Sequence, residues 1–306
     1  MTTLMDTGTR ARRTRDFEVI GSLAHPVVVV LGGISATSHV AAHPGDPTPG
    51  WWQPVASAGS ALDPARCCLI GVEYIVTAGR TVTTQDQARV VAQVLDQLGV
   101  DRAHAVVGAS YGGMVALAFG ELYPTRARQL VVLCAAHQSD PMATAVRLVQ
   151  RRILRLGVAA GREREALELA RALGVISYRS AGEFATRFEA SDGRSETAVA
   201  AYLDHQGRRF AAQFTVERYL ALSESLDIHH VAPERIPLPV TLVGNRVDAI
   251  VPLRQLRELA SRLAGPVQLH LIDSPSGHDA FLTEVDAVSR ILSTTLALED
   301  TDDPHA

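Results

Sequence analysis

Residues 105–114 read Ala-Val-Val-Gly-Ala-Ser-Tyr-Gly-Gly-Met, and this stretch decides the fold class. It begins as a short apolar strand, turns through Gly108-x-Ser110-x-Gly112 and runs directly into the helical pattern of residues 114–122. A serine flanked by glycines between a strand and a helix is the setting of a nucleophile elbow, because small residues let the backbone turn sharply and leave the hydroxyl exposed. The alternative is a glycine-rich turn that only opens a helix. We take Ser110 as the candidate nucleophile.

Apolar runs alternate with helical patterns on both sides of this stretch. Residues 27–31, 67–72 and 130–134 are continuous apolar runs, and residues 85–98 place apolar side chains at helical spacing. Continuous apolar strands are typical of a mostly parallel sheet that helices cover on both faces. The sequence therefore predicts an α/β fold.

The strand pattern stops between residues 140 and 236, where the chain reads as helices rich in arginine, alanine and leucine. It resumes further on, before a last helical pattern near the C-terminus. An inserted helical cap interrupts the core in this interpretation. The predicted divisions are a disordered N-terminal arm at 1–20, a core at 21–139 and 237–298, the cap at 140–236, and a disordered acidic tail at 299–306.

Length, charge and cysteine content limit the possible classes of protein. A chain of 306 residues with 47% hydrophobic content can bury a large core. A formal net charge of −4 provides no basic field for nucleic acid or an anionic membrane, so a small-molecule partner is expected. The cysteines lack the spacing of a disulfide framework or a zinc site, which favours a reducing compartment. Without a secretory signal or a membrane-length apolar run, we expect a cytoplasmic protein.

Two further residues complete a candidate catalytic triad. A serine hydroxyl needs a base to take its proton, and the base needs a carboxylate to fix its tautomer. In the α/β-hydrolase fold these groups follow the order serine, acid, histidine along the chain. Asp248 and His278 stand in that order, each just after a predicted strand. Helix capping is the alternative role of each, and Asp227 and Asp273 are competing acids.

Backbone N–H groups are expected to form an oxyanion hole beside the nucleophile. The N–H of Tyr111 follows Ser110 directly. A second donor should come from the glycine-containing loop at residues 32–36, where we favour the N–H of Ile34, although the assignment could slip by one residue. A plain strand-ending turn is the alternative reading of this loop.

Three motifs carry a resemblance to a known family. They are the Gly-Ala-Ser-Tyr-Gly-Gly-Met of residues 108–114, the Val-Asp-Ala-Ile-Val-Pro of residues 247–252 and the Gly-His-Asp-Ala-Phe-Leu of residues 277–282. With them the chain resembles the MetX-type homoserine O-acyltransferases of the α/β-hydrolase superfamily, over about residues 27–296. The family's histidine-led oxyanion loop is replaced here by Gly-Gly-Ile-Ser-Ala at 32–36. This departure bears on acyl-donor and amino-acid preference.

The resemblance implies roles for individual residues. It makes Ser110 the nucleophile, His278 the base and Asp248 the orienting acid, and it makes Arg151 and Asp279 substrate contacts. An arginine can hold a substrate carboxylate through two hydrogen bonds, and an aspartate beside the catalytic histidine can pair with an ammonium group. The alternatives are a solvated face of an arginine-rich helix for Arg151 and a first-turn helix acid for Asp279.

We therefore expect an acyltransferase that takes an acyl group from acyl-CoA and passes it to the hydroxyl of L-homoserine, a step of methionine biosynthesis. L-serine as acceptor, a serine hydrolase with the same triad and a non-catalytic binding protein are the alternatives. The resemblance suggests a homodimer, and neither a metal nor a tightly bound cofactor is implied. Succinyl-CoA is favoured over acetyl-CoA because a helix of the cap carries several arginines that could meet a second carboxylate: Arg147, Arg151, Arg152 and Arg155.

Overall fold

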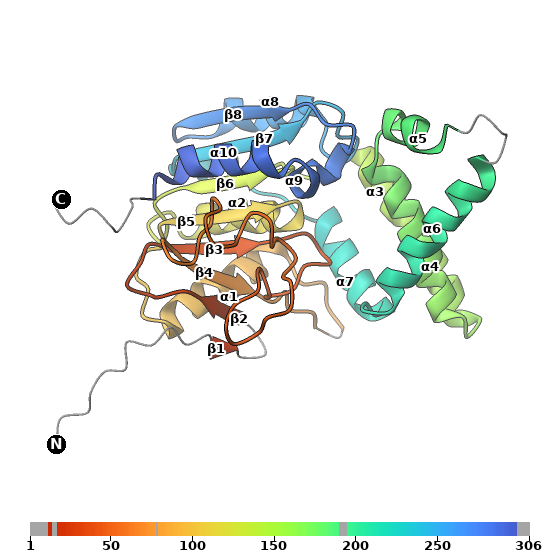
Figure 1. The fold of residues 1–306 in the computed structure, drawn as a ribbon, viewed down its shortest axis with the longest axis horizontal. Coiled ribbons are helices and arrows are strands. Elements are labelled where there is room, and N and C mark those ends of the chain that lie inside the picture. The colour runs from red at the N-terminus through yellow and green to blue at the C-terminus, as the bar shows by residue number, and fades with distance from the viewer. Residues whose placement is uncertain (1–11, 14–16, 78, 190–194, 299–306) are drawn as a thin grey trace, which may run out of the picture.

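The computed structural model describes residues 12–13, 17–77, 79–189 and 195–298 (Figure 1). An eight-stranded sheet in the order β1-β2-β4-β3-β5-β6-β7-β8 forms its centre. β1 pairs with β2 and β2 with β4 antiparallel, and every other neighbouring pair is parallel. The strands are β1 Arg12–Arg13, β2 Phe17–Ile20, β3 Val27–Leu31, β4 Cys68–Val72, β5 Ala105–Ala109, β6 Leu130–Leu133, β7 Val240–Asn245 and β8 Val267–Ile272.

Helices cover both faces of this sheet. α1 (Thr84–Gln97), α2 (Tyr111–Leu122) and α8 (Leu253–Arg262) share an apolar core with one face. α10 (Val285–Leu296) and the chain around residues 40–62 pack on the other face. The strands from β3 to β7 are buried throughout, which explains their continuous apolar sequence. The predicted α/β-hydrolase fold is confirmed.

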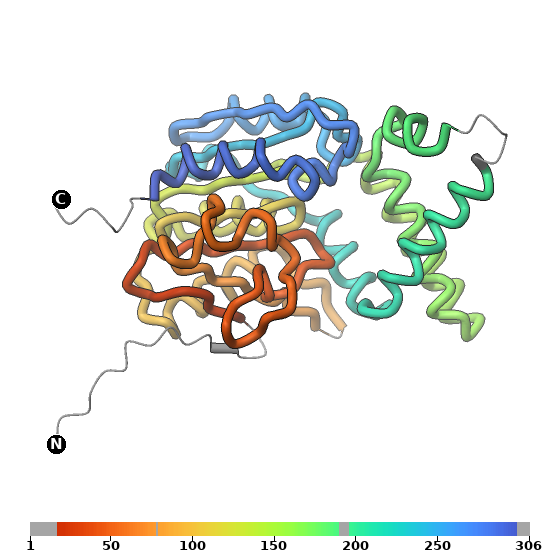
Figure 2. Tube along the Cα trace, in the orientation of Figure 1, coloured from red at the N-terminus to blue at the C-terminus, as the bar shows by residue number. Residues whose placement is uncertain are grey.

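In the described part of the chain, five α-helices lie between β6 and β7 and stand beside the sheet (Figures 1 and 2). We call this segment the helical insertion. It has a small apolar core of its own, to which Leu154, Leu167, Phe210 and Tyr219 contribute. Its helices are α3 Pro141–Ala159, α4 Glu163–Tyr178, α5 Ala181–Phe188, α6 Ser195–Ala211 and α7 Val216–Asp227.

The N-terminal prediction is wrong for residues 17–20. These residues form β2, which is buried and pairs with β4. The acid Glu18 is 0% exposed and is held by two histidines, His39 at 2.8 Å and His43 at 2.9 Å. The partners of this buried charge lie far along the chain, so the short strand gave no recognisable pattern. The rest of the predicted arm, apart from residues 12–13, and the predicted tail at 299–306 lie outside the described residues.

The region that the structure describes contains no helix that is both long and apolar enough to cross a membrane. α9 (Ala280–Thr283) and the single turn η2 (Gly277–Asp279) connect β8 to α10, while η1 (Pro233–Arg235) connects α7 to β7. These connections matter because η2 carries His278 at the edge where the parallel strands end, next to the turn that follows β5. Ligand chemistry collects at this edge in open α/β sheets.

Candidate active site

Ser110 occupies a strained turn between β5 and α2. Its φ of 54° and ψ of −118° lie in a region that residues other than glycine rarely adopt. A Cβ on Gly108 would lie 2.1 Å from the carbonyl oxygen of Gly112, and a Cβ on Gly112 would lie 2.2 Å from that of Leu31. Neither position has room for a side chain, so the glycine spacing read from the sequence has a steric cause.

Three side chains form a continuous line of hydrogen bonds. The Oγ atom of Ser110 lies 2.8 Å from Nε2 of His278, and Nδ1 of His278 lies 2.8 Å from Oδ2 of Asp248. The other carboxylate oxygen, Oδ1, accepts the backbone N–H groups of Ile250 at 2.8 Å and Val251 at 3.0 Å. This arrangement allows His278 to take the serine proton while Asp248 fixes the tautomer of the ring.

The competing acids are engaged elsewhere. Asp227 forms ion pairs with Arg147 and Arg151 in the helical insertion. Asp273 pairs with Arg246 at 2.8 Å, and its side chain is 72% exposed. Asp248 is the acid that contacts His278, as the order of residues along the chain predicts.

A buried amide, Asn245, holds the histidine loop in place, and the sequence analysis missed it. Its Nδ2 atom donates to the carbonyl oxygens of Ser274 at 2.8 Å and Gly277 at 2.7 Å, and its Oδ1 accepts the N–H of Ser274 at 3.1 Å. Gly277 itself has φ of 62°, and a Cβ there would lie 2.2 Å from the carbonyl oxygen of Tyr178. An amide at the end of an apolar strand, just before the candidate acid, was the available signal.

Opposing effects act on the pKa of His278. Burial lowers it, but the charge of Asp248 and the hydrogen bond to that carboxylate raise it, with a smaller rise from Asp279. The positive charge of Arg147 acts in the opposite direction. The net result is a pKa above the ordinary histidine value, which suits a base that must also return its proton.

The predicted oxyanion donors flank Ser110. Tyr111 follows it in the elbow, and Gly33 and Ile34 line the same cavity as Ser110. The Cβ position at Gly33 lies 3.9 Å from Cβ of Ser110. The preceding carbonyl, that of Gly32, accepts the N–H of Gly112 at 2.9 Å and the hydroxyl of Tyr74 at 2.6 Å, which fixes the loop against the elbow. The oxyanion role of Tyr111 and Ile34 stays a prediction.

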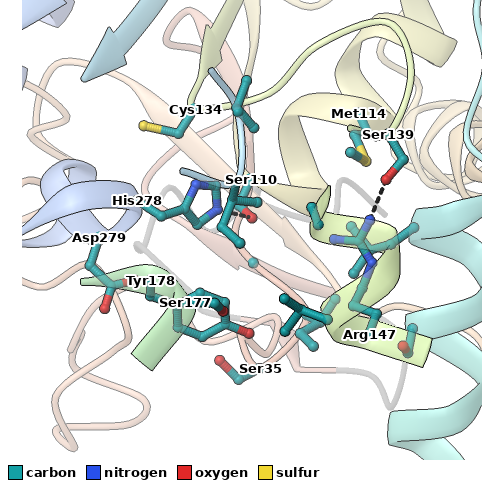
Figure 3. A pocket seen from close by; sticks show the side chains of 18 of the residues that line it. Ser35, Ser110, Met114, Cys134, Ser139, Arg147, Ser177, Tyr178, His278 and Asp279 are labelled. Atoms are coloured by element: carbon teal, nitrogen blue, oxygen red, sulfur yellow. Dashed lines mark hydrogen bonds between the residues drawn. The ribbon is translucent and has the colours of Figure 1, made fainter. Parts of the chain in front are cut away.

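A cavity of about 330 Å³ opens over Ser110 and His278 (Figure 3). Its walls come from the core loops and from the helical insertion, so the insertion covers the candidate nucleophile. In the view of Figure 3, Ser110 and His278 lie between Asp279 and Arg147. The polar wall residues include Ser35, Ser139, Arg147, Gln150, Arg171, Tyr178, Arg209 and Asp279.

Residues 26–285 match the α/β-hydrolase fold family. The chain is 40% identical over 296 residues to a homoserine O-succinyltransferase of Xanthomonas campestris pv. campestris, which covers 94% of this chain and 80% of that protein. It is 31% identical over 320 residues to a homoserine O-acetyltransferase of Mycobacterium bovis, covering 90% of this chain and 84% of the relative. The chain belongs to the homoserine O-acyltransferase family.

A solved structure shares the fold of this chain. The homoserine O-acetyltransferase from Bacillus anthracis matches with a TM-score of 0.82 at 18% identity, over 92% of this chain and 91% of that chain. The predicted class of enzyme, an acyltransferase, is confirmed by the relatives of the chain.

The two predicted substrate contacts differ in their position relative to the cavity. Asp279 lines the cavity directly after His278. Arg151 is 5% exposed and is absent from the described cavity wall. It donates to Oγ and the carbonyl oxygen of Ser223 at 2.9 and 3.1 Å and pairs with Asp227 at 2.6 Å. Asp227 and Ser223 hold the guanidinium group of Arg151 outside the described wall, and its direct contact with substrate stays a prediction.

Arg179 holds Asp279 but is absent from the described wall of the cavity over Ser110, and the sequence analysis missed it. It follows α4, and its Nη2 atom lies 3.1 Å from Oδ2 of Asp279. Its Nε atom is buried without a hydrogen-bond partner among the described residues. A buried N–H group without a partner is costly, so a ligand acceptor at this point would be stabilised. Glu183 also pairs with Arg179 at 3.3 Å, so two acids hold this cation.

One cluster in the described part of the chain has the composition of a metal site: Glu18, His39 and His43. Its hydrogen bonds argue for another role. Nδ1 of His43 accepts the N–H of Gly45 at 3.1 Å, so Nε2 carries the proton and donates to Glu18. Both ring nitrogens of His39 face acceptors, namely Glu18 and the carbonyl oxygen of Thr48 at 2.7 Å. The cluster is a complete hydrogen-bond network that ties β2 to the chain before Trp51.

Proposed function

We propose that the protein transfers an acyl group from acyl-CoA to the hydroxyl of L-homoserine, as a step of methionine biosynthesis. The observation that carries the proposal is the hydrogen-bonded line from Ser110 through His278 to Asp248 at the base of a covered cavity. Membership in the homoserine O-acyltransferase family supports the choice of acceptor. Acyl-CoA acts as a co-substrate, and the proposed reaction uses no tightly bound cofactor.

The first half of the reaction forms an acyl-enzyme. Nε2 of His278 takes the proton of Ser110 as Oγ attacks the thioester carbonyl. The N–H groups of Tyr111 and Ile34 stabilise the negative charge on the carbonyl oxygen. The carbon–sulfur bond then breaks, and His278 gives its proton to the departing CoA thiolate. Asp248 stabilises the imidazolium ring throughout this half.

The second half releases the product. The hydroxyl of L-homoserine gives its proton to His278 as its oxygen attacks the acyl-enzyme carbonyl, and the bond to Ser110 breaks as Oγ regains a proton. Asp279 and Arg179 are suited to the two charged ends of an amino acid: the aspartate to the ammonium group and the arginine to the carboxylate. Their place beside His278 would direct the side-chain hydroxyl toward the acyl group.

A thiol-release assay tests the proposal. Purified protein is incubated with succinyl-CoA or acetyl-CoA, with and without L-homoserine or L-serine, and free CoA is measured together with the acylated amino acid. We expect release that depends on L-homoserine, with Ser110→Ala as the inactive control. Release that ignores both amino acids would identify a hydrolase. Faster transfer to L-serine would change the acceptor.

A further inference from the structure

We propose that Arg147 binds the terminal carboxylate of a dicarboxylic acyl group, such as succinyl, while that group is carried on Ser110. The proposal rests on the acyl transfer proposed above and deepens it by naming the residue that recognises the donor. It also selects one of the four arginines that the sequence suggested, since Arg152 and Arg155 are exposed and absent from the described cavity wall.

The guanidinium group of Arg147 is fixed on one side and available on the other. Its Nε atom donates to Oδ1 of Asp227 at 2.6 Å, and Nη2 donates to Oγ of Ser139. No hydrogen bond or ion pair engages Nη1 within residues 12–13, 17–77, 79–189 and 195–298. Arg147 lines the cavity, and Figure 3 shows it in the wall opposite Asp279. A guanidinium group that is already oriented loses little side-chain freedom when it binds a carboxylate.

The charges behind this wall do not balance. Arg147 and Arg151 share the single carboxylate of Asp227, each at 2.6 Å, and all three side chains are nearly buried. The cluster therefore carries a net positive charge. The two acids in the described cavity wall cannot neutralise it, because Asp140 is bound to Arg254 and Asp279 to Arg179. A buried charge without compensation is costly, so an anionic ligand at Arg147 would be stabilised.

The acyl group is the better source of this anion than the amino acid. Asp279, the anion beside His278, lies on the other side of Ser110 from Arg147 in the view of Figure 3, and Arg179 pairs with Asp279 at 3.1 Å. An amino acid needs both groups at one place, whereas Arg147 offers only a positive charge. A succinyl group differs from an acetyl group by an added CH₂–carboxylate arm. We infer that this arm extends from Ser110 toward α3.

Two other arginines serve as comparisons. Arg155 lies two helical turns beyond Arg147 on α3, where its side chain is 58% exposed and pairs with Glu224 at 3.0 Å. It is a matched control for the loss of one positive charge from this helix. Arg171 lines the cavity, but its guanidinium group lies over the rings of Tyr178 and Phe210. Arg171 and the exposed Arg209, which lines the same cavity, are the rival positions for the donor carboxylate.

The test measures donor binding directly, in the Ser110→Ala background, so that it does not depend on turnover. Calorimetric dissociation constants for succinyl-CoA and acetyl-CoA are compared after Arg147→Met, Arg171→Met and Arg155→Met. We expect Arg147→Met to weaken succinyl-CoA binding by about 10- to 100-fold and acetyl-CoA binding by less than about 3-fold. Arg151 still neutralises Asp227 in this variant, so the fold should persist, and the Tm checks this.

Three results would overturn the inference: equal weakening of both donors, a selective loss in Arg171→Met in place of Arg147→Met, or no loss in either variant. A parallel turnover assay with Arg147→Met tests whether Arg147 binds the carboxylate of L-homoserine instead. A raised KM for L-homoserine with an unchanged donor preference would place the acceptor at Arg147 and also overturn it. Failure of the proposed function is distinct, because wild-type protein would then transfer no acyl group to L-homoserine from either donor.

Discussion

Asp248 and His278 are joined at 2.8 Å through one carboxylate oxygen, while the other oxygen of Asp248 is occupied by two backbone N–H groups. The carboxylate therefore has a fixed orientation before any substrate arrives. Oδ2 of Asp248 can only accept a hydrogen bond, so Nδ1 of His278 must carry the ring proton. Nε2 is then free to take the proton of Ser110. The tautomer of His278 therefore depends on a carboxylate oxygen at this position.

Asp248→Asn should lower kcat by roughly 10⁴-fold with little change in KM, because an amide N–H facing Nδ1 would favour the wrong tautomer of His278. Steady-state kinetics with acetyl-CoA and L-homoserine measures the effect. Asp273→Asn is the matched control, since that acid is exposed and pairs with Arg246, not with His278. Near-normal activity of Asp248→Asn would refute the assignment of the acid.

Asn245→Ala should impair catalysis without removing a group that touches substrate. The variant loses three hydrogen bonds to the loop that carries His278, and it leaves the carbonyl oxygens of Ser274 and Gly277 without this donor. We expect a loss of about 2–4 kcal/mol in the free energy of unfolding. We also expect kcat to fall more than KM changes, because the base is less well positioned. Urea denaturation and kinetics test both parts, and unchanged kcat at full stability would exclude a positioning role.

The pH profile should report the charges around His278. Its pKa is raised in the folded protein, and only the neutral ring can take the serine proton, so kcat/KM should fall as the pH drops through a pKa above the ordinary histidine value. Arg147 lowers that pKa, so Arg147→Met should move the acid limb to higher pH. Asp279 raises the same pKa, so Asp279→Asn should move it to lower pH. Profiles with acetyl-CoA check both signs, and shifts in the reverse directions would contradict the electrostatic account.

The network at β2 predicts a second dependence on pH, this time of stability. Burial lowers the pKa of His39, but the hydrogen bonds to Thr48 and Glu18 and the charge of Glu18 together raise it by more. The pKa of His39 is therefore above its ordinary value in the folded state. A group whose pKa is higher in the folded state stabilises the protein fully at a pH below its unfolded-state pKa. This stabilisation is lost as the pH rises through its folded-state pKa. The difference in unfolding free energy between wild type and His39→Gln should therefore shrink as the pH increases above about 6.5. A constant difference would mean that His39 is neutral in the fold.

The sequence was sufficient to predict the hydrogen-bonded line of Ser110, His278 and Asp248, and insufficient to predict the charged contacts around it. The order of Ser110, Asp248 and His278 follows from a fold in which each residue comes just after a strand, so local motifs predicted their meeting. Arg147 and Arg151 share one face of a helix, and helical spacing alone does not tell which of them reaches the cavity. That choice depends on Asp227, which lies on a different helix and binds both.

The N-terminal error has the same origin. Glu18 in a short apolar segment resembles an exposed acid until His39 and His43 are placed around it. Asn245 and Arg179 were missed because their partners, the loop at residues 274–277 and Asp279, come near only in the folded chain. Motifs report what one stretch of backbone needs, while buried charges and amides are determined by contacts between distant stretches.

An apolar stripe on the helical insertion offers a test of the homodimer, which stays a prediction. Met142, Val149 and Leu156 are seven residues apart on α3 and are 68%, 48% and 71% exposed. This spacing returns to the same helix face, and Met142 also lines an apolar groove with Ile176 of α4. Large apolar side chains grouped on a surface are unfavourable in water and mark contact with a partner. A second copy of the chain would bury the stripe against its own equivalent, as a two-fold interface requires.

We therefore expect a dimer in solution, at twice the mass of one chain, and we expect Met142→Glu combined with Leu156→Glu to give a monomer. Sedimentation equilibrium measures the mass over a range of concentrations. Leu23→Glu is the control, because Leu23 is 45% exposed in the connection before β3, outside the helical insertion. The charged variant should retain the triad geometry, so fluorophosphonate labelling of Ser110 should proceed in the monomer. A wild-type monomer, or a dimer that both charged residues leave intact, would show that this stripe is not the interface.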